Sequence, residues 1–253
     1  MQKQTYTAAL IIIGNEILSG RTQDKNTSWM AEKLVERGIE MREVRIIPDI
    51  PDMIVATVNE MREKADYVFT TGGIGPTHDD ITAENVAAAF GVDLELNDDA
   101  YKMLVRHYGD EYEVTESRKK MAMIPVGAEL IDNPVSGAPG FKLGNVHVLA
   151  GVPKIMQAMF DNVINLLEEG QPVLSQTVMC PLQESQISDG LSDIQKRFEN
   201  VDIGSYPNYR GGTPGVSVVM RSVDKDAVKS VTEEVIQLVK SLGVEPTAVS
   251  HLD

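Results

Sequence analysis

The segment TTGGIGPTHDDIT, residues 70–82, combines a glycine-rich turn with two adjacent carboxylates. Gly72 and Gly73 carry no side chain, so backbone N–H groups at this turn can approach a phosphate closely. The segment holds no lysine and lacks the Lys-Ser/Thr pair of a Walker A loop. The phosphate charge therefore needs another neutraliser, and carboxylates bind Mg²⁺, which bridges to phosphate oxygens. We therefore expect Asp79 and Asp80 to hold a divalent metal beside a nucleotide-like or pterin-like phosphate.

The same acids have a purely structural interpretation. Asp79 and Asp80 precede an expected helix, where Asp80 or Thr82 could cap the first turn and the negative charge would favour the helix dipole. Asp49 stands close before Pro51 and could be a turn residue only. For an isolated acidic pair the capping role is the more common one. The acids and glycines in the neighbouring loops favour a functional role for Asp79 and Asp80.

Strand-like and helix-like stretches alternate along the first part of the chain. The run AALIII, residues 8–13, is apolar throughout, which is typical of a strand buried on both faces. Strands are expected at 8–13, 43–47, 66–71 and 145–151, and helices at 26–37, 82–90, 98–108, 115–121, from 51 onwards, and from 153 to about 169. Residues 132–141 form a turn-rich segment. This alternation predicts an α/β fold with a parallel sheet and right-handed crossovers.

The expected strands place several polar or glycine-containing turns at one edge of the sheet. Ligands of open parallel sheets bind at the carboxyl ends of the strands. Gly14 and Glu16 follow the first strand, Asp49 follows the second, the glycine segment follows the third, and Gly151 follows the last. We expect these four turns to meet and form one pocket.

A change of pattern divides the chain into two expected domains, residues 1–170 and 171–253. EEGQP, residues 168–172, is interpreted as a linker. Beyond it we expect strands at 173–180, 201–206 and 215–222 and helices at 184–198 and 226–241. This order indicates a small α+β domain of the split βαβ kind. It carries no chemical motif, so a packing or dimerisation module is expected.

The composition of the chain limits the kinds of partner that we expect it to bind. The formal net charge is −15, which disfavours nucleic acid because such binding depends on cations that meet phosphates. The basic run at 118–120 is short and is interpreted as a solvated helix face, although Lys119 or Lys120 could reach a phosphate. One cysteine, Cys180, excludes an intrachain disulfide and fits a cytoplasmic protein. The apolar run at 8–13 is too short for a signal peptide or a membrane span, so no membrane association is expected.

The strings GNEILSGRTQDKN, TTGGIGPTHDDIT, APGF and AGVPKIMQAMF resemble the molybdenum-cofactor-biosynthesis (MoaB/Mog-like) fold. The closest resemblance is to the amino-terminal region of the competence/damage-inducible protein family, CinA. The later string GSYPN is similar to the small KH-like module of that family. The resemblance implies a three-layer, mostly parallel sheet followed by that module. It leaves no room for the carboxyl-terminal amidohydrolase domain of CinA.

The resemblance also implies a function. In the CinA branch it implies a metal-dependent pyrophosphatase acting on ADP-ribose or related compounds such as FAD and CoA, with Mg²⁺ or Co²⁺ as the metal. In the Mog branch it implies binding and adenylylation of molybdopterin. A non-catalytic nucleotide or pterin sensor is the third possibility. The expected partner is a small molecule, and a homo-oligomer, dimer or trimer, is expected because relatives of the fold assemble.

The resemblance assigns roles to residues that match its motifs. Asp80 and Asp49 match catalytic or metal-site acids, and Asp79 stands beside the first of them. The matched ligand-binding positions are Gly72, Gly73, Gly75, Pro76, Thr77, Gly14, Glu16, Asp24, Asn26, Gly140 and Gly151. Asp24 and Asn26 also suit a helix cap. The chain departs from the pattern at Asn15, Lys25 and Ile155, where relatives carry Asp, a small hydroxyl residue and Glu.

Overall fold

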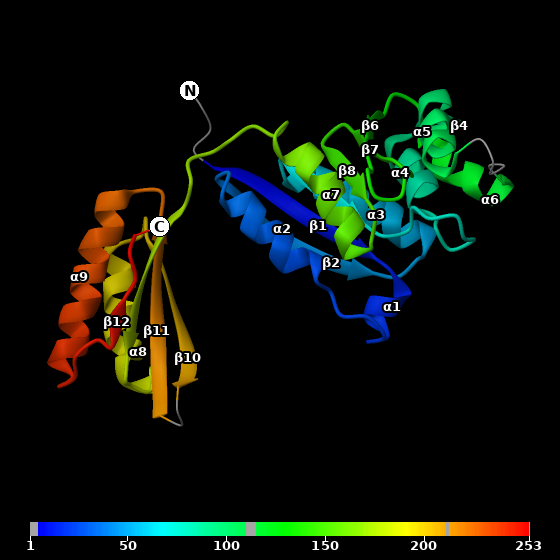
Figure 1. Ribbon diagram of the computed structural model, residues 1–253. Helices are drawn as coiled ribbons and strands as arrows, with labels where there is room; N and C mark the ends of the chain where they lie inside the picture. Colours follow the sequence, from blue (N-terminus) through cyan, green and yellow to red (C-terminus); the bar gives the residue numbers. More distant parts are fainter. Residues whose placement is uncertain (1–4, 110–114, 211–212, 253) are drawn as a thin grey trace. The chain divides into compact units, whose positions relative to one another are not determined.

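A computed structural model describes residues 5–109, 115–210 and 213–252 of the chain (Figure 1). The chain divides into two compact units, Met1–Gly170 and Gln171–Asp253. Each unit has its own hydrophobic core.

The first unit is built on a mixed sheet in which the parallel strands lie in the middle and at one edge. The strand order is β2 (Ile39–Ile47), β1 (Tyr6–Ile13), β3 (Tyr67–Thr71), β8 (Val146–Leu149), β7 (Gly140–Leu143) and β6 (Glu129–Ile131). The first four are mutually parallel, whereas β7 and β6 add in antiparallel fashion. The expected α/β fold with a mostly parallel sheet is confirmed. The expectation of turns throughout 132–141 is wrong at its end, where β7 begins.

Helices cover both faces of this sheet, which gives three layers (Figure 1). Alternate residues of β1 point to opposite faces, so Ile11 and Ile13 join one core and Leu10 and Ile12 the other. The first core is completed by α3 (Pro51–Lys64), α4 (Thr82–Phe90) and α5 (Asp98–Tyr108), and the second by α2 (Asn26–Val35) and α7 (Pro153–Ile164). Burial on both sides explains the uninterrupted apolar sequence of β1.

Short elements account for most differences from the expected boundaries. They are α1 (Asn15–Leu18), β4 (Leu94–Leu96) paired with β5 (Met123–Pro125), α6 (Glu116–Lys119) and a 3₁₀ turn (Lys120–Ala122). Helix α7 ends at Ile164 rather than near residue 169. The residues that follow it contact Arg37 instead of continuing the helix. The N–H of Gly170 donates to the carbonyl of Arg37 at 3.0 Å, and the Arg37 side chain contacts Asn165 and Glu169.

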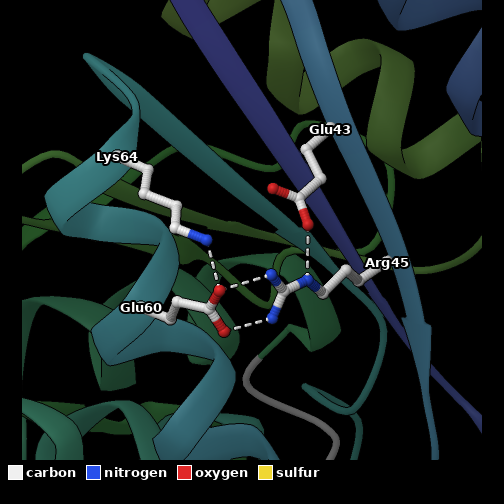
Figure 2. A network of polar contacts seen from close by, with 4 residues as sticks. All are labelled: Glu43, Arg45, Glu60 and Lys64. Atoms are coloured by element: carbon white, nitrogen blue, oxygen red, sulfur yellow. Dashed lines mark hydrogen bonds and ion pairs between the residues drawn. The ribbon is translucent and has the colours of Figure 1, made fainter.

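An ion-pair network fastens the edge strand β2 to α3 (Figure 2). Arg45 Nε donates to Glu43 Oε1 at 2.7 Å, and both terminal nitrogens of Arg45 contact the carboxylate of Glu60. Lys64 pairs with the same carboxylate. Hydrogen bonds from Arg45 and Lys64 lower the pKa of Glu60 to about 2.

The second unit is a four-stranded sheet covered by two helices. Its elements run β9 (Leu174–Cys180), α8 (Glu184–Arg197), β10 (Asp202–Arg210), β11 (Thr213–Ser222), α9 (Lys225–Ser241) and β12 (Ala248–Val249). Strand β11 lies between β9 and β10 and is antiparallel to both, so β9 and β10 are parallel with one strand inserted. This arrangement confirms the expected split βαβ connection. Cys180 is buried in this core, and burial raises the pKa of its thiol.

Within residues 5–109, 115–210 and 213–252, none of the helices combines the length and apolar character that crossing a bilayer requires.

Candidate functional site

The loop between β3 and α4 requires its glycines. A Cβ on Gly72 would lie 2.1 Å from the carbonyl oxygen of Ile13, and one on Gly73 would lie 2.3 Å from Thr82 Oγ1. Their φ angles, 104° and 67°, also favour glycine. Thr82 fixes the loop from the helix, since its hydroxyl donates to the carbonyl of Gly72 at 2.8 Å and its N–H donates to that of Gly73 at 3.0 Å.

This geometry leaves a row of backbone donors available. The N–H groups of Gly73, Ile74 and Gly75 donate to no acceptor among the described residues. These residues also line a cleft. Successive free N–H groups in a concave loop form an anion-binding nest.

Asp80 does not cap α4. The N-cap position is Ile81, and none of the described side chains caps this helix, so the expectation that Asp80 or Thr82 would do so is wrong. Asp80 Oδ2 instead accepts the N–H and the hydroxyl of Thr77 at 2.8 and 2.5 Å. A Cβ on Gly75 would lie 2.6 Å from the same oxygen. The carboxylate is thus folded back onto the loop and packed against the Cα of Gly75.

Asp79 and Asp80 meet at the hydroxyl of Thr77. Thr77 Oγ1 lies 2.6 Å from Asp79 Oδ1 and 2.5 Å from Asp80 Oδ2, yet a hydroxyl has one proton to donate. The hydroxyl can therefore donate to only one of the two carboxylates at a time, and a cation beside the pair would relieve their repulsion. The Thr77 hydroxyl is also the main cause that lowers the pKa of Asp79. His78 is 96% exposed and lies 3.9 Å from Asp79, as expected for a loop residue.

These residues fit Mg²⁺ better than a metal enclosed by protein. No cluster of three His, Cys, Asp or Glu residues with metal-ligand spacing occurs within the described ranges. Mg²⁺ is commonly held by one or two carboxylates and completes its shell with water and substrate phosphate. The pair Asp79 and Asp80 suits that mode.

The loop after β1 is fixed by Asp49. Asp49 Oδ2 accepts the N–H of Asn15 at 2.9 Å, and the N–H of Gly14 donates to the carbonyl of Ile47 at 3.1 Å. A Cβ on Gly14 would lie 2.5 Å from a carboxylate oxygen of Glu16, so glycine gives that carboxylate room. Asp49 therefore supports the loop that carries Glu16.

The first and last loops of the site are joined by Asn26. Asp24 Oδ1 accepts the N–H groups of Asn26 and Thr27 at 2.9 and 3.3 Å and so holds the first turn of α2. The N-cap position itself is Lys25, so the cap expected at Asp24 and Asn26 is wrong in position. The amide nitrogen of Asn26 donates to the carbonyl of Gly151 at 2.9 Å. A Cβ on Gly151 would lie 3.2 Å from the Cα of Gly72, so the two loop backbones are in close contact.

The loops enclose a cleft with a volume of about 540 Å³. Of the expected residues, its lining includes Glu16, Gly72, Gly73, Gly75, Pro76, Asp80 and Gly151, together with Ile155. Asp24 and Asn26 line a smaller adjoining hollow of about 50 Å³ with Glu16 and Gly151. Gly14, Asp49, Thr77 and Asp79 stand behind or beside the cleft and do not line it. Gly140 is buried in β7, where a Cβ would lie 2.2 Å from the carbonyl of Val148, so its role is close packing.

One cation of the basic run at 118–120 reaches this loop, although these residues were expected mainly as surface charges. Lys120 Nζ donates to the carbonyl of Thr77 at 2.7 Å, across 43 positions of sequence. The guanidinium of Arg118 lies 4.1 Å from the ring centroid of Tyr108, which lines the cleft. The basic run gave no local sign of either contact, because both depend on how the chain returns to the loop.

Comparisons with known proteins show the family to which the chain belongs. A family model described as "Probable molybdopterin binding domain" matches residues 9–172, and one described as "FAD synthase, middle domain" matches residues 172–247. A protein from Archaeoglobus fulgidus is 35% identical over 230 residues, which cover 90% of this chain and 96% of that protein. A protein from Pyrobaculum arsenaticum is 34% identical over 251 residues, with 92% and 95% covered.

One solved structure is similar over the first unit. It is described as the crystal structure of the protein CinA, with unknown function, from Thermoplasma acidophilum. The sequences are 37% identical, the TM-score is 0.60, and the match covers 64% of this chain and 99% of the other. The resemblance inferred from the motifs is thereby confirmed. The chain belongs to the family of the probable molybdopterin binding domain and has a CinA protein among its structural relatives.

Proposed function

We propose that the cleft hydrolyses the pyrophosphate bond of a nucleotide pyrophosphate such as ADP-ribose, FAD or CoA, with Mg²⁺ or Co²⁺. The observation that carries the proposal is the row of free N–H groups from Gly73 to Gly75 beside the carboxylate of Asp80. Amide donors bind anionic oxygens, whereas a carboxylate beside them repels an anion unless a cation intervenes. The combination suits a metal-bound phosphate. The name of the second family model also makes FAD a natural first substrate to test.

Different residues of the cleft have different roles in the proposed reaction. The N–H groups of Gly73, Ile74 and Gly75 hold the oxygens of one phosphate and stabilise the charge that develops on them. Glu16, exposed on the same cleft, orients the attacking water by accepting a hydrogen bond from it. Asp49, expected from the resemblance as a catalytic or metal-site acid, holds the loop in place through the N–H of Asn15.

Asp79 and Asp80 are the residues that would hold the metal, because both carboxylates approach one hydroxyl. A bound Mg²⁺ would supply positive charge to the phosphate oxygens. The position of Asp80 depends on the lack of a side chain at Gly75.

The test is product release from ADP-ribose, FAD and CoA, followed by chromatography with added Mg²⁺ or Co²⁺ and with EDTA. We expect AMP from ADP-ribose and FAD, and no turnover in EDTA. Asp80→Asn should lower kcat about a hundredfold, the order seen on removal of one preorganised electrostatic group. Asp161→Asn, an exposed acid on α7, is the matched control and should leave kcat unchanged. Equal turnover by both variants would refute the assignment of Asp80.

A pterin ligand is the second candidate, favoured by the name of the first family model. The same cleft would then bind the phosphate of molybdopterin and either transfer an adenylyl group to it or act as a sensor. If the wild-type protein leaves all three pyrophosphates intact while molybdopterin raises its melting temperature, this candidate replaces the hydrolase.

A further inference from the structure

A row of side chains crosses one face of the first sheet near the end of α7. The strand register places Phe69 beside His147 and His147 beside Lys142. Lys142 in turn pairs with Glu129. Neighbours across a sheet point to the same face, and Phe69 packs in the same core as α7, which ends at Ile164. His147, Lys142 and Glu129 line a cavity together with residues at and after the end of that helix.

This cavity has a volume of about 410 Å³, within the range of about 300–1,000 Å³ that is usual for small-molecule sites. Tyr67, the first residue of β3, lines it, whereas the glycine loop follows the last residue of that strand. Among the described residues, it shares no lining residue with the 540 Å³ cleft. It is therefore a separate cavity at the opposite end of β3, and we call it the amino-end cavity. Its apolar lining residues are Leu130, Ile131, Val163, Leu166 and Leu167.

His147 brings an unsatisfied nitrogen to the wall of the amino-end cavity. The side chain is 3% exposed, and its Nδ1 is buried with no hydrogen-bond partner among the described residues. Hydrogen bonds to the backbone of Val68 and Asn145 raise its pKa, as expected where an imidazole N–H donates to a carbonyl. Because Nδ1 takes no part in them, we assign the proton to Nε2, which leaves Nδ1 as an acceptor. A donor group that reaches this wall would satisfy it.

The charged groups of the amino-end cavity are mainly acidic. Glu129 and Glu168 are exposed acids, and Lys142 is the one basic side chain among the described lining residues besides His147. Burial lowers the pKa of His147 to about 4, so its imidazole is neutral at pH 7. Lys142 Nζ lies 3.4 Å from Glu129 Oε1, so that pair largely cancels, whereas Glu168 is hydrogen-bonded to the neutral hydroxyl of Tyr6. The cavity therefore attracts a positive charge rather than a negative one.

The lining of the amino-end cavity suits an organic cation better than a metal ion. The parts of the chain that the structure describes hold no group of three His, Cys, Asp or Glu residues that could bind a metal. The apolar lining residues suit a hydrocarbon body, whose burial is favourable. A primary amine combines both features, because its ammonium group carries one positive charge and donates three hydrogen bonds.

We infer that the amino-end cavity is a second ligand site, which binds a small primary amine with an apolar body. The ammonium group meets the carboxylates of Glu168 and Glu129, and the body lies against the apolar lining residues. The inference does not rest on the proposed function, because the glycine loop and Asp80 take no part in this site.

The test compares three probes that share one indole ring and one two-carbon chain. Tryptamine ends in an ammonium group, tryptophol in a hydroxyl and indole-3-propionate in a carboxylate. Their affinities for the full chain are measured by titration calorimetry at pH 7. We expect tryptamine to bind at least about tenfold more tightly than indole-3-propionate, because the acids repel a carboxylate, with tryptophol between them.

Substitutions locate the binding. Glu168→Gln should weaken tryptamine about fivefold, the upper end for an exposed charge pair, whereas Asp161→Asn, at an exposed acid on α7, should not change it. Lys142→Met should not weaken tryptamine, because it removes the charge that competes for Glu129. Asp80→Asn should leave tryptamine binding unchanged, which separates this site from the cleft.

A steric variant tests occupation of the amino-end cavity. Leu130→Trp should weaken tryptamine about tenfold, as for a steric change in an apolar pocket, and Leu130→Phe serves if that variant does not fold. Leu96→Trp, at a position 46% exposed on β4, is the control and should bind like the wild type. The inference is overturned if wild type does not bind tryptamine, if it binds indole-3-propionate as tightly, or if Glu168→Gln or the folded Leu130 variants bind tryptamine unchanged. A loss of tryptamine binding in Lys142→Met or Asp80→Asn would overturn it as well.

Discussion

A single buried histidine should make the first unit sensitive to mild acid. His147 lies on β8, is 3% exposed, and stacks on Phe69 with ring centroids 5.1 Å apart. Its Nδ1 is buried and has no hydrogen-bond partner among the described residues. Burial, with a smaller contribution from Lys142, lowers its pKa from 6.5 to about 4, while hydrogen bonds to the backbone of Val68 and Asn145 and, less, the charge of Glu129 oppose the shift.

The size of the effect follows from these two values. Because the pKa of the folded state is the lower one, the unfolded chain binds more protons, and stability is lost as the pH falls from 6.5 towards 4. Between pH 7 and pH 5 the free energy of unfolding should fall by about 2 kcal/mol from this group alone. The loss should level off below the folded-state pKa.

The assay is urea unfolding followed by tryptophan fluorescence. The chain has one tryptophan, Trp29, which packs against Phe160 in the first unit, so its signal reports that unit. We expect wild type to lose about 2 kcal/mol more than His147→Gln between pH 7 and pH 5. His78→Gln, at an exposed position, should behave like the wild type. If His147→Gln keeps the full wild-type slope, the interpretation of His147 as a buried neutral imidazole is wrong.

Other substitutions test the packing of the loop and the sheet. Gly75→Ala should lower kcat while leaving the melting temperature nearly unchanged, because its Cβ would displace the Asp80 carboxylate and Gly75 is not among the glycines with positive φ; unaltered kinetics would contradict this. Gly140→Ala should cost about 1–3 kcal/mol of stability through the clash with the carbonyl of Val148, as for overpacking elsewhere, and urea titration measures it. Glu60→Gln should change the melting temperature only slightly, and the difference should vanish in high salt because its ion pairs are exposed.

The parts of the fold that follow from local rules could be predicted from the sequence. Helices α4 and α5 begin and end at the expected residues, because Gly91 with a φ of 67° stops one and the Asn97 side chain caps the other. Strands β6 and β7 could not be recognised. They are three and four residues long, too short to show a period, and pairing with neighbours defines them.

The candidate site also combines features that arise locally in the sequence with features that arise between distant segments. The positive φ angles of Gly72 and Gly73 arise within one turn, so the motif reveals this need for glycine, whereas the close approach of Ile13 to Gly72 depends on the sheet. The hydrogen bond that occupies Asp49 and the reach of Lys120 to Thr77 arise between distant segments. Sequence patterns can indicate which residues gather at an edge of a sheet, but not which of them bind one another and which remain free for a ligand.

The contact between the backbones at Gly72 and Gly151 has a consequence for how the cleft responds to its surroundings. Gly72, Gly73, Gly75 and Gly151 line the cleft without side chains, so peptide groups, whose charge does not change with pH, form that part of its wall. The affinity of this part of the wall for an anion should therefore stay constant wherever the protein is folded. Any change of ligand binding with pH would then come from other groups, and substitution of each charged side chain that lines the cleft would identify its source.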